Sequence, residues 1–173
     1  MDFREEYLAV WRQAYQDHPG LERFRAIKKG LLWGVMALFA LQKLIVVVSM
    51  WRIGSPAALL FGAVVGMALP GIFALAVWRG NWKFSLVLLL PALYLAYDVV
   101  GNGFSALASG DSYYFTFYLI LAVEGLMALY LAGVALWLSV PVQNRQLGDT
   151  ANQVNEYLIR RSKEIAAQNR PQR

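Results

Sequence analysis

Four long blocks of apolar residues constrain this chain of 173 residues more than any other feature. A bilayer core about 30 Å thick is crossed by about 20 residues of helix, because each residue adds about 1.5 Å. Barrel strands would alternate polar and apolar residues, and these blocks do not. The sequence therefore predicts an all-α integral membrane protein whose four transmembrane helices form a bundle. The spans are expected at about residues 31–50, 57–78, 82–100 and 115–140.

Composition excludes several other classes of protein. Hydrophobic residues make up 58% of the chain and charged residues 16%, whereas soluble domains carry about 25% charge. The chain has no cysteine and a single histidine, His18, which excludes disulfide frameworks, thiolate zinc sites and iron–sulfur clusters. Its carboxylates are too scattered for a metal cage. We expect no metal, no cofactor and no catalytic residues.

The distribution of basic residues predicts the orientation in the membrane. Six Lys or Arg residues precede the first block, two lie between the second and third blocks, and six follow the fourth, whereas the loops on the other side carry one. Basic segments stay in the cytoplasm, and an even number of spans returns the chain to the side where it began. We predict a multi-pass protein of the cell membrane, with a bacterial inner membrane as the best fit, and with both termini cytoplasmic.

The two terminal segments, residues 1–30 and 141–173, both carry amphipathic helical patterns. In the first, apolar and aromatic residues recur at helical spacing until Asp17-His18-Pro19-Gly20 breaks the helix. A second short helical pattern, with Leu21, Phe24 and Ile27, then leads through Lys28 and Lys29 into the first span. The N-terminal segment either lies among lipid headgroups, where anionic lipid would attract Lys28 and Lys29, or packs beneath the bundle.

In the C-terminal segment, Thr150 and Gln153 form a capping-box pattern that opens a helix reaching about Ala167. Its apolar face is expected to meet the N-terminal helix or a partner's helix; that face holds Leu147, Ala151, Val154, Leu158 and Ile165. Neither segment has the dense basic run with interleaved aromatics that nucleic-acid binding needs, so no nucleic acid is expected.

Ionisable residues inside the blocks supply the only chemical lead. Lys43 and Glu124 lie about 12–13 Å below the outer surface, at matching depth and with opposite charge. Each costs about 2.5–3.5 kcal/mol to insert, so each needs a structural or functional reason. One interpretation is a buried ion pair that fixes helix register; the other is an ion or proton pathway. Asp98, two residues from the end of its block, is expected near the surface and solvated.

Other polar and small residues accompany these charges. Gln42 adjoins Lys43, and Tyr94 lies one turn before Asp98 on the same face. A stripe of small residues that includes Ala128 and Ala132 extends from Glu124, so we expect Glu124 to face a helix interface. The pattern Gly62-x-x-x-Gly66 indicates helix packing, within this chain or between copies. The segment 101–114 is expected to be a solvated loop, with a re-entrant lid or a short interfacial helix as alternatives.

Two functions fit these features. The first is a non-catalytic accessory or scaffolding component of a membrane complex, with the lipid bilayer and a protein partner or a second copy as its contacts. The alternative is a small ion- or proton-coupled transporter or a channel-like protein that uses Glu124, Lys43 and Asp98. An intramembrane enzyme ranks third, because no nucleophile and base fall together.

Overall fold

The computed structural model describes residues 3–51, 54–109 and 115–168, and this part of the chain is helical apart from short turns. The elements are α1 (Phe3–Asp17), α2 (Leu21–Met50), α3 (Pro56–Arg79), α4 (Trp82–Ser85), a 3-10 turn η1 (Leu86–Leu88), α5 (Leu89–Ser109), α6 (Phe115–Ser139) and α7 (Val142–Gln168). The all-α prediction is confirmed for the described residues.

Four helical stretches are long and apolar enough to cross a membrane, which suggests a membrane protein. They are Leu21–Met50, Pro56–Arg79, Trp82–Ala106 and Phe117–Ser139, close to the four predicted spans. The first begins ten residues earlier than predicted, because α2 runs without interruption from the turn at Gly20. Gly20 has a φ of 94°, a left-handed conformation that suits glycine, and the predicted helix break at residues 17–20 is confirmed.

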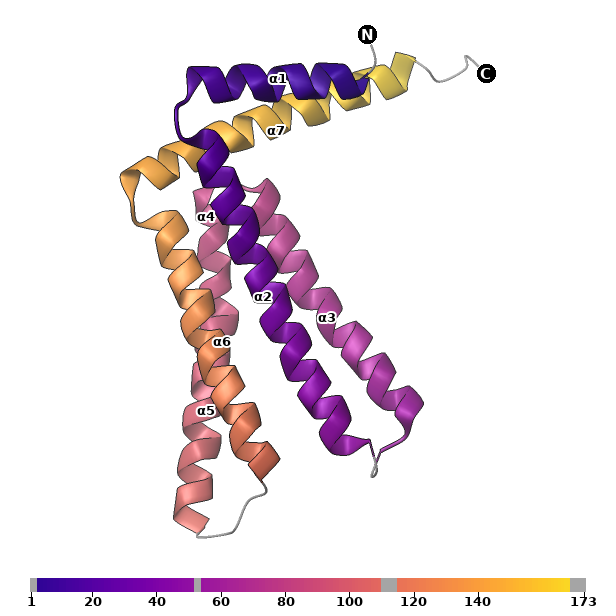
Figure 1. Cartoon of the computed structure of the whole chain (residues 1–173), viewed down its shortest axis with the longest axis vertical. Helices are drawn as coiled ribbons and strands as arrows, with labels where there is room; N and C mark the ends of the chain where they lie inside the picture. Colours follow the sequence, from indigo (N-terminus) through magenta and orange to yellow (C-terminus); the bar gives the residue numbers. More distant parts are fainter. Residues whose placement is uncertain (1–2, 52–53, 110–114, 169–173) are drawn as a thin grey trace.

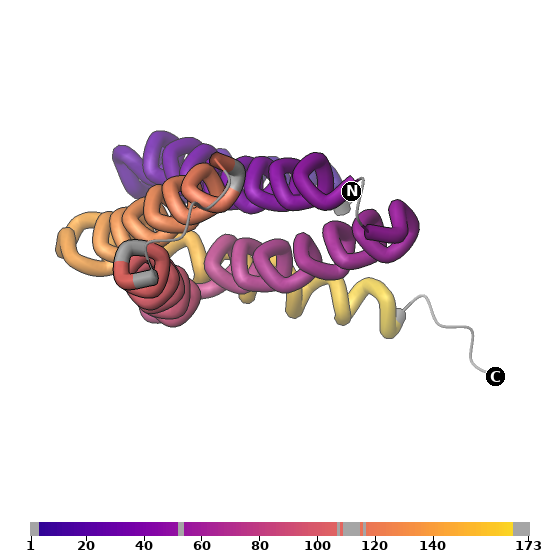
Figure 2. The backbone as a smooth tube through the Cα atoms, turned by 90° about the horizontal axis from the view of Figure 1, so that it is seen from below, coloured from indigo at the N-terminus to yellow at the C-terminus, as the bar shows by residue number. Residues whose placement is uncertain are grey.

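The long helices form two hairpins that are joined along one seam. α2 packs on α3, and α5 packs on α6, while α2 and α6 join the two hairpins. The hairpins lie close together near α1 and α7 and diverge toward their far ends (Figures 1 and 2). This arrangement is more open than the predicted bundle, and a closed bundle is not confirmed.

The seam between α2 and α6 is tightly packed. Val35, Met127 and Leu131 are each at most 2% exposed. At the end of the seam near α1, the Tyr130 hydroxyl donates a hydrogen bond of 3.2 Å to the Leu31 carbonyl oxygen. Tyr130 reaches this carbonyl across Gly34, where an added Cβ would lie 2.1 Å from the phenol oxygen. Gly34 therefore leaves room on α2 for the Tyr130 ring.

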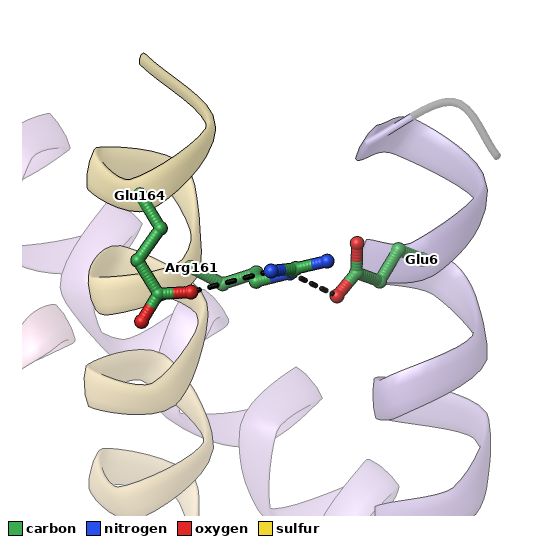
Figure 3. Close-up of polar contacts among 3 residues, drawn as sticks. All are labelled: Glu6, Arg161 and Glu164. Atoms are coloured by element: carbon green, nitrogen blue, oxygen red, sulfur yellow. Dashed lines mark hydrogen bonds and ion pairs between the residues drawn. The ribbon is translucent and has the colours of Figure 1, made fainter. Parts of the chain in front are cut away.

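The two terminal helices lie at the same end of the long helices and contact each other (Figure 1). Each buries part of its apolar face, with Trp11 of α1 at 3% and Leu158 of α7 at 4% exposed. Between the two helices, Arg161 Nε of α7 donates a hydrogen bond of 2.9 Å to Glu6 Oε1 of α1 (Figure 3). Within α7, Arg161 Nη1 donates to Glu164 at 3.2 Å. The hydrogen-bonded Glu6 and Glu164 carboxylates raise the pKa of the Arg161 guanidinium above its ordinary value. Because the pair is part-exposed, burial rather than this contact accounts for most of the docking.

Two predictions about where helices begin and end are wrong. Residues 101–109 continue α5 instead of forming a loop, and the rest of the predicted loop, 110–114, lies outside the described residues. The helix continues through Gly101 and Gly103, each of which costs a helix only about 1 kcal/mol relative to alanine. α7 begins directly after Pro141, not at Thr150. The Thr150 hydroxyl instead donates to the Gln146 carbonyl at 3.0 Å, within the helix.

Replacing Gly34 by Ala tests the seam. We expect Gly34→Ala to lower the free energy of unfolding by about 1–3 kcal/mol, because the new methyl group overlaps the Tyr130 phenol. Thermal unfolding of the purified protein in detergent measures the loss, and adding Tyr130→Phe should restore part of it. The matched control is Gly30→Ala on the same helix, where a Cβ meets nothing within 4 Å. Equal effects of the two substitutions would contradict the packing described for the seam.

Candidate functional site

A cleft of about 540 Å³ lies between the two hairpins, at the level of the membrane spans. Its walls come from α2, α3, η1, α5 and α6, and most of its lining is apolar. Into this apolar surface project the five polar residues that the sequence singled out: Gln42, Lys43, Tyr94, Asp98 and Glu124. The fold thus brings together residues up to 82 positions apart in one place.

Glu124 lies in the interface between α2 and α6 and is 8% exposed. The amide Nε2 of Gln42, also 8% exposed, donates a hydrogen bond of 2.6 Å to Glu124 Oε1. A buried amide-to-carboxylate hydrogen bond satisfies one carboxylate oxygen and links the two hairpins. Gln42, not Lys43, is therefore the direct partner of Glu124.

The position of Lys43 does not match the buried ion pair with Glu124 that was one interpretation of the sequence. Within the part of the chain that the structure describes, no ion pair within 4 Å joins Lys43 to Glu124. The Lys43 side chain lies over Gly66 of α3, where an added Cβ would be 2.7 Å from Cε and 3.3 Å from Nζ. Lys43 and Glu124 lie at matching depth, but equal depth does not make two side chains face each other. Gln42, which is about 100° around the helix from Lys43, is the residue that faces α6.

The backbone near Lys43 adds a polar feature that the sequence analysis overlooked. Pro70, which also lines the cleft, has no N–H to donate to the Gly66 carbonyl four residues earlier. The ammonium of Lys43 thus lies beside a turn of α3 that lacks its usual donor. A mid-helix proline four residues after a glycine is the signal that could have indicated this.

Asp98 lies farther from the end of its helix than the sequence predicts. Because α5 continues to Ser109, Asp98 is 11 residues from the end of its helix, or about 16 Å along the axis. Its carboxyl group lies beside that of Glu124. Tyr94 lines the cleft from the same helix, but no hydrogen bond between described residues joins its hydroxyl to Asp98. The cleft holds two carboxyl groups and one ammonium group.

The small residues divide into two groups. On α6, Ala128 is 7% exposed and Ala132 is part-buried against the core, so this stripe lies in the helix interface. On α3, Gly66 makes room for Lys43, while Gly62 is exposed with nothing within 4 Å of an added Cβ. The Gly62-x-x-x-Gly66 pattern therefore leaves Gly62 open on the outer surface of α3.

No family model, curated protein sequence or solved structure matches this chain. Among the described residues, no group of three or more His, Asp or Glu side chains is placed to hold a metal ion. The chemistry of the cleft is therefore that of carboxyl, amide, phenol and ammonium groups, which bind cations, protons and polar side chains.

A double-mutant cycle tests the link between Gln42 and Glu124. Gln42→Leu leaves a buried carboxyl group without its donor, so we expect a loss of about 1–3 kcal/mol in the free energy of unfolding. Glu124→Leu leaves the Gln42 amide without its acceptor and should also destabilise. The double variant should lose less than the sum of the two, by about 0.5 kcal/mol or more. Strictly additive losses in thermal or denaturant unfolding would show that the two side chains do not interact.

Proposed function

We propose that this protein is a non-catalytic accessory component of a membrane complex, and that its cleft receives a transmembrane segment of a partner. The observation that carries the proposal is the polar cluster in a cleft between two diverging hairpins. Ionisable side chains at membrane depth normally face a bundle interior or a water-filled cavity. The hairpins diverge away from α1 and α7 (Figure 1), and a helix seated between α3 and α5 would enclose the cluster.

The charges in the cleft favour a partner of particular chemistry. Asp98 and Glu124 outnumber Lys43, and the Gln42 amide occupies only one carboxylate oxygen. A partner helix with a basic or hydroxyl side chain at mid-membrane would pair with the remaining carboxylate oxygens. Hydrogen bonds of this kind between membrane helices contribute about 0.6–2 kcal/mol each.

The terminal helices extend this proposal to the cytoplasm. We place both termini on the cytoplasmic side of a cell membrane, as the basic residues predict. The docking of α1 on α7 at one end of the spans is compatible with that orientation (Figure 1). In this orientation, the exposed side of the α1–α7 pair is a second surface for partners in the same complex.

A second function is favoured by one specific contact, the adjacent carboxyl groups of Asp98 and Glu124. Two neighbouring carboxyl groups in a membrane cavity share or exchange a proton more readily than two separate ones. In this alternative the protein couples the movement of an ion or proton to the cleft, with Lys43 as the counter-charge.

Single cysteines test the first proposal cleanly, because the natural chain has none. With a bifunctional thiol and amine cross-linker in native membranes, Leu69→Cys and Val65→Cys, which line the cleft and are 60% and 52% exposed, should each form a discrete adduct. The control, Leu129→Cys, is 75% exposed on α6 outside the cleft lining and should not. Adding Asp98→Asn should reduce the adduct several-fold. Adducts of equal yield at all three positions, or at none, would contradict a partner in the cleft.

The same acidic residues separate the two functions in reconstituted vesicles. The alternative predicts a proton or ion flux that Glu124→Gln abolishes while the protein stays folded. Glu156→Gln on exposed α7 serves as the control for loss of one negative charge. A wild-type protein without flux, or an unchanged flux in Glu124→Gln, would exclude transport through the cleft.

A further inference from the structure

A second cavity, of about 830 Å³, lies beneath α1 and against α2 and α3. It is separate from the cleft and shares no lining residue with it. We propose that this cavity binds a single glycerophospholipid, with the lipid phosphate at Arg25 and Lys29 and an acyl chain along α2 and α3.

The end of the cavity near α1 is built around a fixed guanidinium group. The Arg25 guanidinium carbon lies 3.4 Å from the ring centroid of Trp11, and Nη1 donates to the Tyr15 hydroxyl. Stacking uses the face of the guanidinium plane and leaves the other N–H donors at its edges. Arg25 is therefore held in one orientation while keeping donors for a phosphate, which arginine binds well in bidentate geometry.

Lys29 and Lys28 have different roles, although the sequence suggested that both attract lipid. Lys28 is 4% exposed and lies 3.4 Å from the carbonyl oxygens of Trp78 and Gly80, at the C-terminal end of α3. It satisfies backbone acceptors there, as a basic residue at a helix C-terminus does. Lys29 is exposed, lines the cavity and lies one turn after Arg25, so these two residues supply its positive charge.

The other end of the cavity is apolar. Its lining continues along α2 through Leu32 to Met36 and along α3 from Trp78 back to Gly71. Met36 is 11 residues beyond Arg25, about 16 Å along the helix axis, so one cavity extends from headgroup level into acyl-chain level. Inorganic phosphate would occupy only the basic end, whereas a phospholipid would fill both. Glu22 at the basic end suits the amine of a zwitterionic headgroup and reduces the net charge.

Native mass spectrometry tests this site with the purified full-length protein and phosphatidylglycerol or phosphatidylethanolamine of defined chain length. We expect one retained lipid per chain. A basic residue near the headgroups is worth about 1 kcal/mol, so Lys29→Gln should weaken retention about fivefold and Arg25→Gln with Lys29→Gln about 25-fold. Gly71→Leu should also weaken lipid retention, because the added uncharged side chain would occupy space at the apolar end of the cavity.

Arg23→Gln is the matched control, because Arg23 is exposed on the same helix but does not line the cavity. Equal lipid retention in Arg23→Gln and the double variant would overturn the proposal. Lipid release by millimolar inorganic phosphate, with no effect of Gly71→Leu, would overturn it in favour of a simple anion site. Retention that falls in the charge variants and in Gly71→Leu, and that survives inorganic phosphate, would support it.

Discussion

The structure depends on the seam between α2 and α6, because this contact joins the two hairpins. Val35 and Leu131 pack in the seam, Tyr130 crosses it at one end over Gly34, and Gln42 bonds Glu124 farther along. Apolar packing gives little advantage over lipid contact in a membrane, so close approach and interhelical hydrogen bonds carry the association. Both kinds of contact occur here. The seam also forms one wall of the polar cleft, because Val35, Gln42, Glu124 and Leu131 line it.

One residue step around α2 separates a side chain that faces α6 from one that faces α3 and the cleft. Gln42 faces α6 and satisfies Glu124, whereas Lys43 lies over Gly66 toward α3. The amide therefore contributes to the seam without neutralising the carboxyl groups, and the ammonium group stays in the cleft. This division leaves Asp98, Glu124 and Lys43 side by side without a close ion pair between them in the described chain, which is an arrangement suited to binding another charged or polar group.

Much of the helical layout could be predicted from the sequence, because apolar length and helix breaks are properties of single segments. The four apolar stretches and the break at Gly20 follow from single segments of chain. The site was predicted only as a set of residues, since depth along a helix can be counted but rotation around it depends on the packed partner. Lys43 is an example: it lies at the same depth as Glu124, but its side chain lies toward Gly66 of α3 and not toward Glu124. Asp98 was expected near the end of its helix because hydropathy ended the span at Val100, whereas α5 continues to Ser109.

The central claim is that the two hairpins diverge in the membrane and leave the polar cleft between α3 and α5. Spin labels in a lipid nanodisc test it directly, at Phe61 on α3, Phe104 on α5 and Val48 on α2, which are all exposed. We expect a clearly longer distance for the pair Phe61 and Phe104 than for the pair Phe61 and Val48 within one hairpin. Similar distances for the two pairs, as in a closed four-helix bundle, would contradict it.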